Sequence, residues 1–210
     1  MIREDIADFI STIPNNVTLV AATKYVGSKE MEILLKNGIN NFGENRTEAF
    51  LEKYYELNNK DIIWHFIGHL QRNKANDVID KIEYLHSLDS LKLAKLIDEK
   101  RNTPLKCFVE VSINLEENKN GVPYYKVKDF VKELLKFKNI KLVGFMMMAI
   151  KSSENDSLDL QFRKLRELRD EVEKELDIKI PYLSMGMSDD YKEALKEGAT
   201  HIRLGRILFK

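Results

Sequence analysis

Strand-like and helix-like segments alternate along the whole chain, and this alternation restricts the fold more than any other feature. Short apolar or β-branched runs predict eight strands, at Val17–Thr23, Ile39–Phe42, Ile63–Ile67, Tyr84–Ser87, Lys106–Ser112, Lys141–Met148, Tyr182–Ser184 and His201–Leu204. Amphipathic segments predict helices between them, from Ser28 to Gly38 and at Thr47–Leu57, Lys74–Lys81, Leu91–Glu99, Lys126–Phe137, Leu160–Leu176 and Asp190–Glu197. Such alternation is typical of right-handed βαβ crossovers and a parallel sheet.

Eight strand–helix units predict an α/β protein whose sheet closes into a single (β/α)8 TIM-type barrel. On pattern alone, an open doubly wound sheet is the alternative. Apolar residues at helical spacing over Ile2–Ile13 predict an extra N-terminal helix. The four prolines are scattered and no low-complexity linker interrupts the chain, so we expect one domain over residues 1–210.

Composition excludes several classes of function. The chain has 34 Lys plus Arg and 34 Asp plus Glu, so it lacks the basic excess on which nucleic-acid or anionic-membrane binding rests. The single cysteine, Cys107, cannot form an intramolecular disulfide or a paired-cysteine zinc site. The longest strongly apolar stretch, Leu142 to Ile150, is far shorter than a membrane span, and the charged N-terminus has no signal core. We therefore expect a cytoplasmic protein, and the lack of an apolar exposed stripe predicts a monomer.

The loops after the last two predicted strands have the character of a phosphate site. They contain Gly186 and Gly205 and lead into helix starts, where backbone N–H groups bind phosphate and glycine lets the backbone approach closely. In a barrel, such sites often lie at these two loops. Ser188 adds a hydroxyl, and Arg203 or Arg206 adds a positive charge. The caps of ordinary βα turns are the alternative interpretation.

Lys24 directly follows the apolar first strand. A lysine held against an apolar barrel mouth loses solvation, which favours the neutral amine that forms a Schiff base with an aldehyde. A solvent-facing lysine at a strand end is the alternative. Together with the phosphate loops, Lys24 predicts a site for a phosphorylated aldehyde, and pyridoxal 5'-phosphate is the commonest such cofactor.

Two further patterns carry less weight. His65 and His69 are four residues apart, but they flank a strand end with Gly68 between them, so the helical metal-pair spacing does not apply and we predict no metal site. The run Met146–Met148 belongs to a barrel strand, where packing between the core and the helix layer is the expected role.

Several motifs resemble those of the pyridoxal phosphate homeostasis proteins. They occur in order over nearly the whole chain: Val20–Lys24 (VAATK), Phe42–Arg46 (FGENR), His65–Lys74 (HFIGHLQRNK), Gly144–Met148 (GFMMM), Leu183–Asp190 (LSMGMSDD) and Arg203–Gly205 (RLG). One departure from the family pattern is Glu48, where a glutamine is usual.

The resemblance implies a barrel similar to the N-terminal domain of bacterial alanine racemase, with pyridoxal 5'-phosphate bound as a Schiff base on Lys24. It implies that Arg203 lies near the pyridine nitrogen and that Asn45 lies near the ring face or phenolic oxygen. The remaining cofactor-binding residues that it implies, mostly around the phosphate, are Ser184, Met185, Gly186, Ser188, Gly205 and Arg206.

The resemblance also implies a role. Members of the family carry or buffer the cofactor and balance vitamin B6 and amino-acid pools without robust catalysis, and recipient apo-enzymes are the partners that such a carrier serves. A small racemase or related amino-acid enzyme with the same cofactor is the first alternative. It is disfavoured because a racemase of this fold needs a second base from a separate domain, for which eight βα units leave no room. A Schiff-base aldolase that acts on a sugar phosphate is the second alternative.

Overall fold

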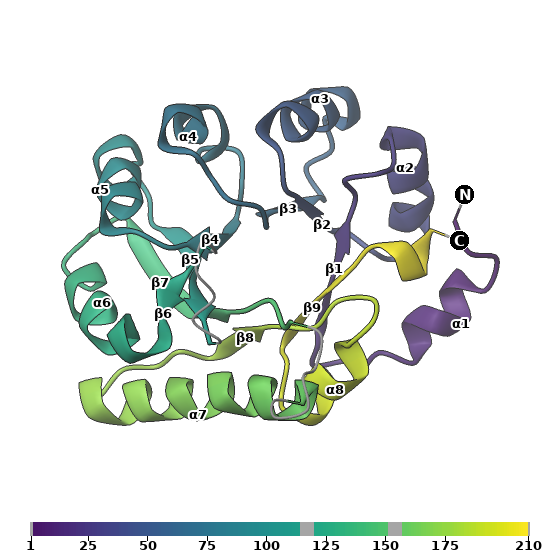
Figure 1. Cartoon of the computed structure of the whole chain (residues 1–210). Coiled ribbons are helices and arrows are strands. Elements are labelled where there is room, and N and C mark those ends of the chain that lie inside the picture. Colours follow the sequence, from purple (N-terminus) through teal and green to yellow (C-terminus); the bar gives the residue numbers. More distant parts are fainter. Residues whose placement is uncertain (1, 114–119, 151–156, 210) are drawn as a thin grey trace.

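The computed structural model describes residues 2–113, 120–150 and 157–209. A central ring of parallel strands is surrounded by helices (Figure 1). The strands are β1 Thr18–Ala22, β2 Asn41–Glu44, β3 Ile63–Phe66, β4 Tyr84–Leu88, β5 Leu105–Ser112, β6 Val122–Pro123, β7 Ile140–Met146, β8 Tyr182–Ser184 and β9 His201–Leu204. The helices are α1 Ile6–Ser11, α2 Ser28–Lys36, α3 Thr47–Leu57, α4 Arg72–Val78, α5 Leu91–Lys100, α6 Val127–Leu134, α7 Leu158–Leu176 and α8 Tyr191–Lys196, with 3₁₀ turns at Tyr124–Lys126 and Arg206–Leu208.

The sheet closes on itself. Its strands follow the order β4-β3-β2-β1-β9-β8-β7-β5, and β4 also pairs with β5, with Tyr84 opposite Lys106 and Leu85 opposite Cys107. An open doubly wound sheet has two free edges, whereas this pairing joins them. The predicted (β/α)8 barrel is therefore confirmed, and the two-residue β6 only extends the pairing at the end of β5.

The apolar core lies between the barrel and its helices. In β3, Trp64 and Phe66 point outward and pack edge-on against Phe50 of α3, with ring centroids 5.2 and 6.4 Å apart. Phe50 is fully buried, and burial of a side chain of this size contributes about 1.5–3 kcal/mol. Cys107 is buried in the same core, and burial raises the pKa of its thiol. The thiol is therefore inert.

The barrel interior, by contrast, holds buried histidines. His65 lies between Trp64 and Phe66 in β3, so its side chain points inward, where it stacks on Tyr84 at 4.7 Å. His86 of β4 stacks on Phe108 at 4.3 Å, and His201 of β9 meets the same ring at 5.1 Å. Burial lowers the pKa of both His65 and His86 well below 6.5, and lowers the pKa of His201 to about 4. All three imidazoles are therefore neutral at pH 7.

The second strand differs most from its prediction. The sequence predicts Ile39–Phe42, whereas β2 covers Asn41–Glu44. Ile39 packs into the core before the strand begins, and the polar Asn41 and Glu44 pair in register with residues of β3. The first helix is also shorter than predicted, at Ile6–Ser11, although residues on either side of it still contact the core.

Among the described residues, no helix has the length and apolar character needed to cross a membrane.

The buried histidines predict a loss of stability in acid. Between pH 6.5 and pH 4 an unfolded chain protonates His201 whereas the folded chain does not, so the free energy of unfolding falls as the pH falls through this window. Each such group contributes a slope of about 1.4 kcal/mol per pH unit. We expect His201→Phe to flatten the slope by that amount, as measured by urea unfolding at several pH values. Identical slopes for the variant and the parent chain would show that His201 already titrates normally in the folded state.

Candidate functional site

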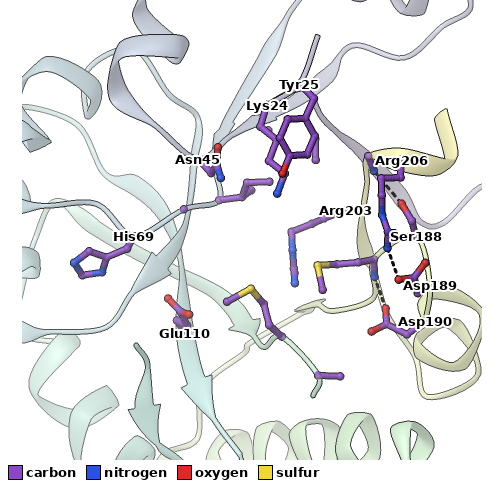
Figure 2. A pocket seen from close by; sticks show the side chains of 18 of the residues that line it. Lys24, Tyr25, Asn45, His69, Glu110, Ser188, Asp189, Asp190, Arg203 and Arg206 are labelled. Atoms are coloured by element: carbon purple, nitrogen blue, oxygen red, sulfur yellow. Dashed lines mark hydrogen bonds and ion pairs between the residues drawn. The ribbon is translucent and has the colours of Figure 1, made fainter. Parts of the chain in front are cut away.

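A cavity of about 760 Å³ opens at the C-terminal ends of the barrel strands. Residues that follow β1, β2, β3, β7, β8 and β9 line it, together with Glu110 near the end of β5. In Figure 2, Arg203 lies between the loop at Ser188–Asp190 on one side and Asn45, His69 and Glu110 on the other. The strand ends of the closed barrel therefore meet in one site, as barrel geometry requires.

Lys24 lines this cavity, and of the two interpretations that the sequence left open, a desolvated lysine or one that faces solvent, the structure has the second. The residue is exposed, and its Nζ lies 4.6 Å from the ring centroid of Tyr25, which is itself 78% exposed. The reason is local. β1 ends at Ala22, so Lys24 already belongs to the turn beyond the strand. The amine is thus accessible to both the cavity and water.

A buried ion pair holds the turn that carries Lys24. Lys53 Nζ of α3 lies 2.5 Å from Glu44 Oε1 and donates a 2.6 Å hydrogen bond to the carbonyl oxygen of Thr23. The Thr23 hydroxyl donates to the same Glu44 oxygen at 2.5 Å. Thr23 precedes Lys24 directly, and both its backbone and its side chain are tied to this pair. The pair therefore fixes where the chain leaves β1.

On the neighbouring strands, Asn45 and Gly68 pack with no space between them. A Cβ on Gly68 would lie 2.6 Å from Cα of Asn45 and would also meet its carbonyl oxygen. Glycine is therefore required at residue 68 for the loop after β3 to pack against the residue that follows β2. This contact places Asn45, a residue that the resemblance assigns to the cofactor, at the wall of the cavity.

The loops after β8 and β9 meet at Ser188. Its Oγ accepts hydrogen bonds from the backbone N–H groups of Gly205 and Ile207, both at 3.3 Å. Gly186 has a φ of +92°, and a Cβ there would lie 2.7 Å from Cβ of Ala194, so this residue must be glycine for the loop to pack on α8. Two backbone amides thus hold the Ser188 oxygen at the edge of the cavity, which leaves the hydroxyl hydrogen as the donor that can meet an anion.

Arg203 is the buried cation of the site. Its Nη1 donates to Ser184 Oγ at 2.6 Å, and its Nη2 donates to the carbonyl oxygen of Met147 at 2.8 Å. Burial lowers the pKa of Arg203 to about 10, so the guanidinium stays charged at pH 7. Burial, with a smaller effect of Asp89, raises the pKa of Glu110 to about 7. At neutral pH, the Glu110 carboxyl is therefore only partly ionised, and a small change in pH changes the fraction that carries a proton.

The structure brings most of the sequence-predicted residues together. Lys24, Asn45, Ser188, Arg203, Gly205 and Arg206 line the cavity. Ser184, Met185 and Gly186 are buried behind it, with Met185 in the apolar core and Ser184 bonded to Arg203. Arg206 is largely exposed and pairs with Asp189 at the surface.

Sequence reasoning missed other residues of the cavity. Glu110 and Tyr25 follow the same rule of strand ends that identified Lys24, and that rule applied to every strand would have found them. Met148 was expected to pack, but it is 53% exposed and lines the cavity because β7 ends at Met146. Glu48, the departure noted above, pairs with Lys74 at the surface and does not line the cavity.

Comparison with known proteins identifies the family. The sequence matches the family described as alanine racemase, N-terminal domain, over residues 2–210. A pyridoxal phosphate homeostasis protein of Aquifex aeolicus is 38% identical over 198 residues, which make up 93% of this chain and 87% of that protein. One of Synechocystis sp. is 37% identical over 207 residues, or 97% of this chain and 95% of that protein. The chain belongs to the pyridoxal phosphate homeostasis protein family.

Solved structures extend this comparison to three dimensions. PipY of Synechococcus elongatus PCC7942, solved without PLP, is 29% identical with a TM-score of 0.93, and the match covers 100% of both chains. The same protein with PLP bound is 28% identical with a TM-score of 0.90 over 99% of both chains. An alanine racemase of Clostridium difficile is 17% identical with a TM-score of 0.82 over 99% of this chain and 57% of that one, a likeness of fold alone.

In this pyridoxal phosphate homeostasis family member, the Glu44–Lys53 pair is open to a stability test. Removal of one partner leaves the other charge buried and unpaired, which costs about 3–5 kcal/mol. We expect Lys53→Met to lower the free energy of unfolding by this amount in urea denaturation, and the double variant Lys53→Met/Glu44→Leu to recover most of the loss. A single variant as stable as the parent chain would mean that the pair does not hold the end of β1.

Proposed function

We propose that this chain binds pyridoxal 5'-phosphate in the strand-end cavity and carries it, in vitamin B6 and amino-acid homeostasis, without robust catalysis. One observation carries the proposal: an accessible amine, a donor cluster centred on Ser188 and the buried guanidinium of Arg203 line a single cavity. The names of the curated relatives, and the PipY structure with PLP bound, support it.

The residues present fit this cofactor. A cavity of about 760 Å³ is of the size that proteins use for small organic ligands. Its wall combines apolar side chains such as Met148 and Ile150 with a few polar groups, the composition that an aromatic ring with a charged tail requires. The cofactor supplies an aldehyde that condenses reversibly with primary amines and an aromatic ring that withdraws electrons.

We assign the covalent attachment to Lys24. The Lys24 amine would hold the cofactor through the reversible condensation of a primary amine with the aldehyde that the cofactor supplies. Lys24 suits this role because its Nζ is accessible from the cavity while the preceding residue, Thr23, is fixed by Lys53 and Glu44. The chain thus presents a free amine on a rigid support.

We assign the phosphate to the loops after β8 and β9. Ser188 Oγ already accepts two backbone N–H groups, so its own hydrogen is available to donate to an anion. The N–H groups of Gly205 and Ile207 hold the Ser188 oxygen in place, and Gly186 permits the loop to turn. Arg206 adds a cation at the outer edge, where Asp189 now pairs with it.

We assign the ring to Arg203 and Asn45. Arg203 is held from behind by Ser184 and Met147 and lines the cavity, so a cation faces the ring region. A permanent positive charge beside a pyridine nitrogen opposes protonation of that nitrogen and weakens the ring as an electron sink. This electrostatic effect suits a protein that retains the cofactor more than one that uses it in turnover. Asn45 lies on the wall beside Lys24 and can donate to or accept from the ring substituents.

We propose that the chain acts as a monomer in the cytoplasm and passes its cofactor to recipient apo-enzymes. A small pyridoxal phosphate-dependent amino-acid racemase or related enzyme is the alternative. It is disfavoured because Lys24 is exposed, whereas reactive intermediates need a site that excludes water. The resemblance to alanine racemase concerns the fold alone.

Lys24→Ala tests the covalent assignment. With the parent chain, pyridoxal phosphate should produce a visible absorbance band, and borohydride reduction followed by peptide mapping should place the label on Lys24. We expect Lys24→Ala to lose both the band and the label, because no other amine is expected to replace Lys24. Lys29→Ala, at an exposed position of α2, is the matched control and should behave as the parent chain. A label of equal yield in Lys24→Ala would refute the assignment.

Ser188→Ala tests the phosphate assignment. Loss of the hydroxyl removes one hydrogen-bond donor to a charged group, and we expect about a tenfold weaker Kd for pyridoxal phosphate. Pyridoxal, which lacks the phosphate, should bind the variant and the parent chain equally, as measured by titration of the absorbance band. If both ligands weaken by the same factor, Ser188 does not contact the phosphate. Ser11→Ala, at the exposed end of α1, serves as the control.

A further inference from the structure

A continuous line of hydrogen bonds crosses the barrel interior behind the cavity. It begins at Arg203 of β9, whose Nη1 lies 2.6 Å from Ser184 Oγ of β8. Ser184 Oγ lies 2.8 Å from His86 Nδ1 of β4, and His86 Nε2 lies 2.9 Å from His65 Nδ1 of β3. His65 Nε2 lies 2.9 Å from Asn41 Oδ1 of β2. Four side chains thus connect the guanidinium of the site to the opposite end of the barrel.

At the Asn41 end of this line, the neighbouring contacts fix which atom donates in each hydrogen bond. Asn41 Nδ2 donates to Asn40 Oδ1 at 2.9 Å, which leaves Asn41 Oδ1 as the acceptor for His65. His65 Nε2 therefore carries a hydrogen. Because burial keeps this imidazole neutral, its Nδ1 carries none and must accept from His86 Nε2. The same reasoning leaves His86 Nδ1 as the acceptor of the Ser184 hydroxyl.

The near end requires the same direction. A guanidinium only donates, so Ser184 Oγ must accept from Arg203. The hydroxyl hydrogen of Ser184 then has to point elsewhere, and His86 Nδ1 is the acceptor within reach. Both ends give one consistent arrangement, Arg203 to Ser184 to His86 to His65 to Asn41, in which every donor has an acceptor. Reversal of the His86–His65 link would leave His65 Nε2 without a hydrogen, so that two acceptors, His65 Nε2 and Asn41 Oδ1, would face each other.

We propose that His86 and His65 are positioning residues for the cofactor site: they hold the Ser184 hydroxyl turned away from Arg203, so that its oxygen accepts from the guanidinium. This proposal rests on the function proposed above. Among the described residues, Arg203 has no carboxylate within hydrogen-bond distance, so Ser184 and the Met147 carbonyl alone set the orientation of its plane. Loss of His86 frees the hydroxyl to rotate and weakens one of these two supports.

His201 provides a matched control. It is buried in the same cluster, with its ring 6.1 Å from His86 and 5.1 Å from Phe108. Its Nδ1, however, lies 3.0 Å from Thr200 Oγ1, and no hydrogen bond joins it to Ser184 or Arg203 in the described part of the chain. His201→Phe therefore removes a buried imidazole without interruption of the line.

The tautomers can be measured without any cofactor. Long-range ¹H–¹⁵N spectra of ¹⁵N-labelled protein at pH 7 should show His65 and His86 as neutral imidazoles with the hydrogen on Nε2. A hydrogen on Nδ1 of His86, or a charged His86, would overturn the proposal. This result is independent of whether the chain binds pyridoxal phosphate, so it separates failure of the line from failure of the proposed function.

The effect on the site is tested with the full chain and pyridoxal phosphate. We expect His86→Phe to weaken the Kd roughly five- to tenfold and to shift the absorbance maximum of the bound cofactor. His86→Gln, whose amide both accepts and donates, should recover at least half of the loss, and His201→Phe should leave the Kd and the absorbance maximum unchanged. If His86→Phe does not fold, Ser184→Ala interrupts the line with a smaller change in volume. The proposal fails if the variant that interrupts the line binds and absorbs as the parent chain does, or if His201→Phe has the same effect.

Discussion

A charged guanidinium buried inside a barrel is the constraint on which the rest of the site depends. Removal of such a group from water is costly unless its donors find acceptors. Arg203 finds two, the hydroxyl of Ser184 and the carbonyl oxygen of Met147, and both are neutral. The carboxyl groups of Glu110 and Asp190 act on it only through the electric field. The charge is therefore left available to the cavity and is not cancelled by a direct ion pair.

The need to satisfy the buried guanidinium of Arg203 explains why the barrel interior contains buried polar side chains. Ser184 accepts from Arg203, so its hydroxyl hydrogen needs an acceptor of its own. His86 is that acceptor, and His86 in turn donates to His65. Burial keeps both imidazoles neutral, and neutral rings can also stack on Tyr84 and Phe108. The apolar core between the barrel and the helices stabilises the fold, while the interior combines the polar line that supports Arg203 with a second buried apolar cluster around Phe108. The two layers share strands but have separate roles, as Trp64 and His65 on opposite faces of β3 demonstrate.

The sequence predicts the barrel and the main residues of the cavity because these follow from local rules. The strand–helix alternation is periodic, the helix at Thr47–Leu57 has the predicted limits, and Gly186 has the positive φ that its place in a turn requires. The line behind Arg203 could not be predicted in this way. His65 and His86 are 21 residues apart and meet because β3 pairs with β4, whereas His86 and Ser184 are 98 residues apart and meet only because the barrel closes. The sequence left open whether Lys24 is desolvated or faces solvent, and the structure has it exposed in the turn beyond β1, because the strand already ends at Ala22.

Lys24 and Arg203 come from neighbouring strands, but one side chain is exposed to water and the other is buried. β1 and β9 pair with Val20 opposite Arg203, so Lys24 follows four residues after the partner of Arg203, beyond the end of β1. Arg203 is enclosed and fixed by a polar line, whereas Lys24 is exposed on a fixed turn. Enzymes that stabilise charged intermediates on a cofactor exclude water from the reactive bond. Lys24 is open to water and Arg203 is not, so the arrangement differs at its amine from the enclosed sites that protect reactive intermediates.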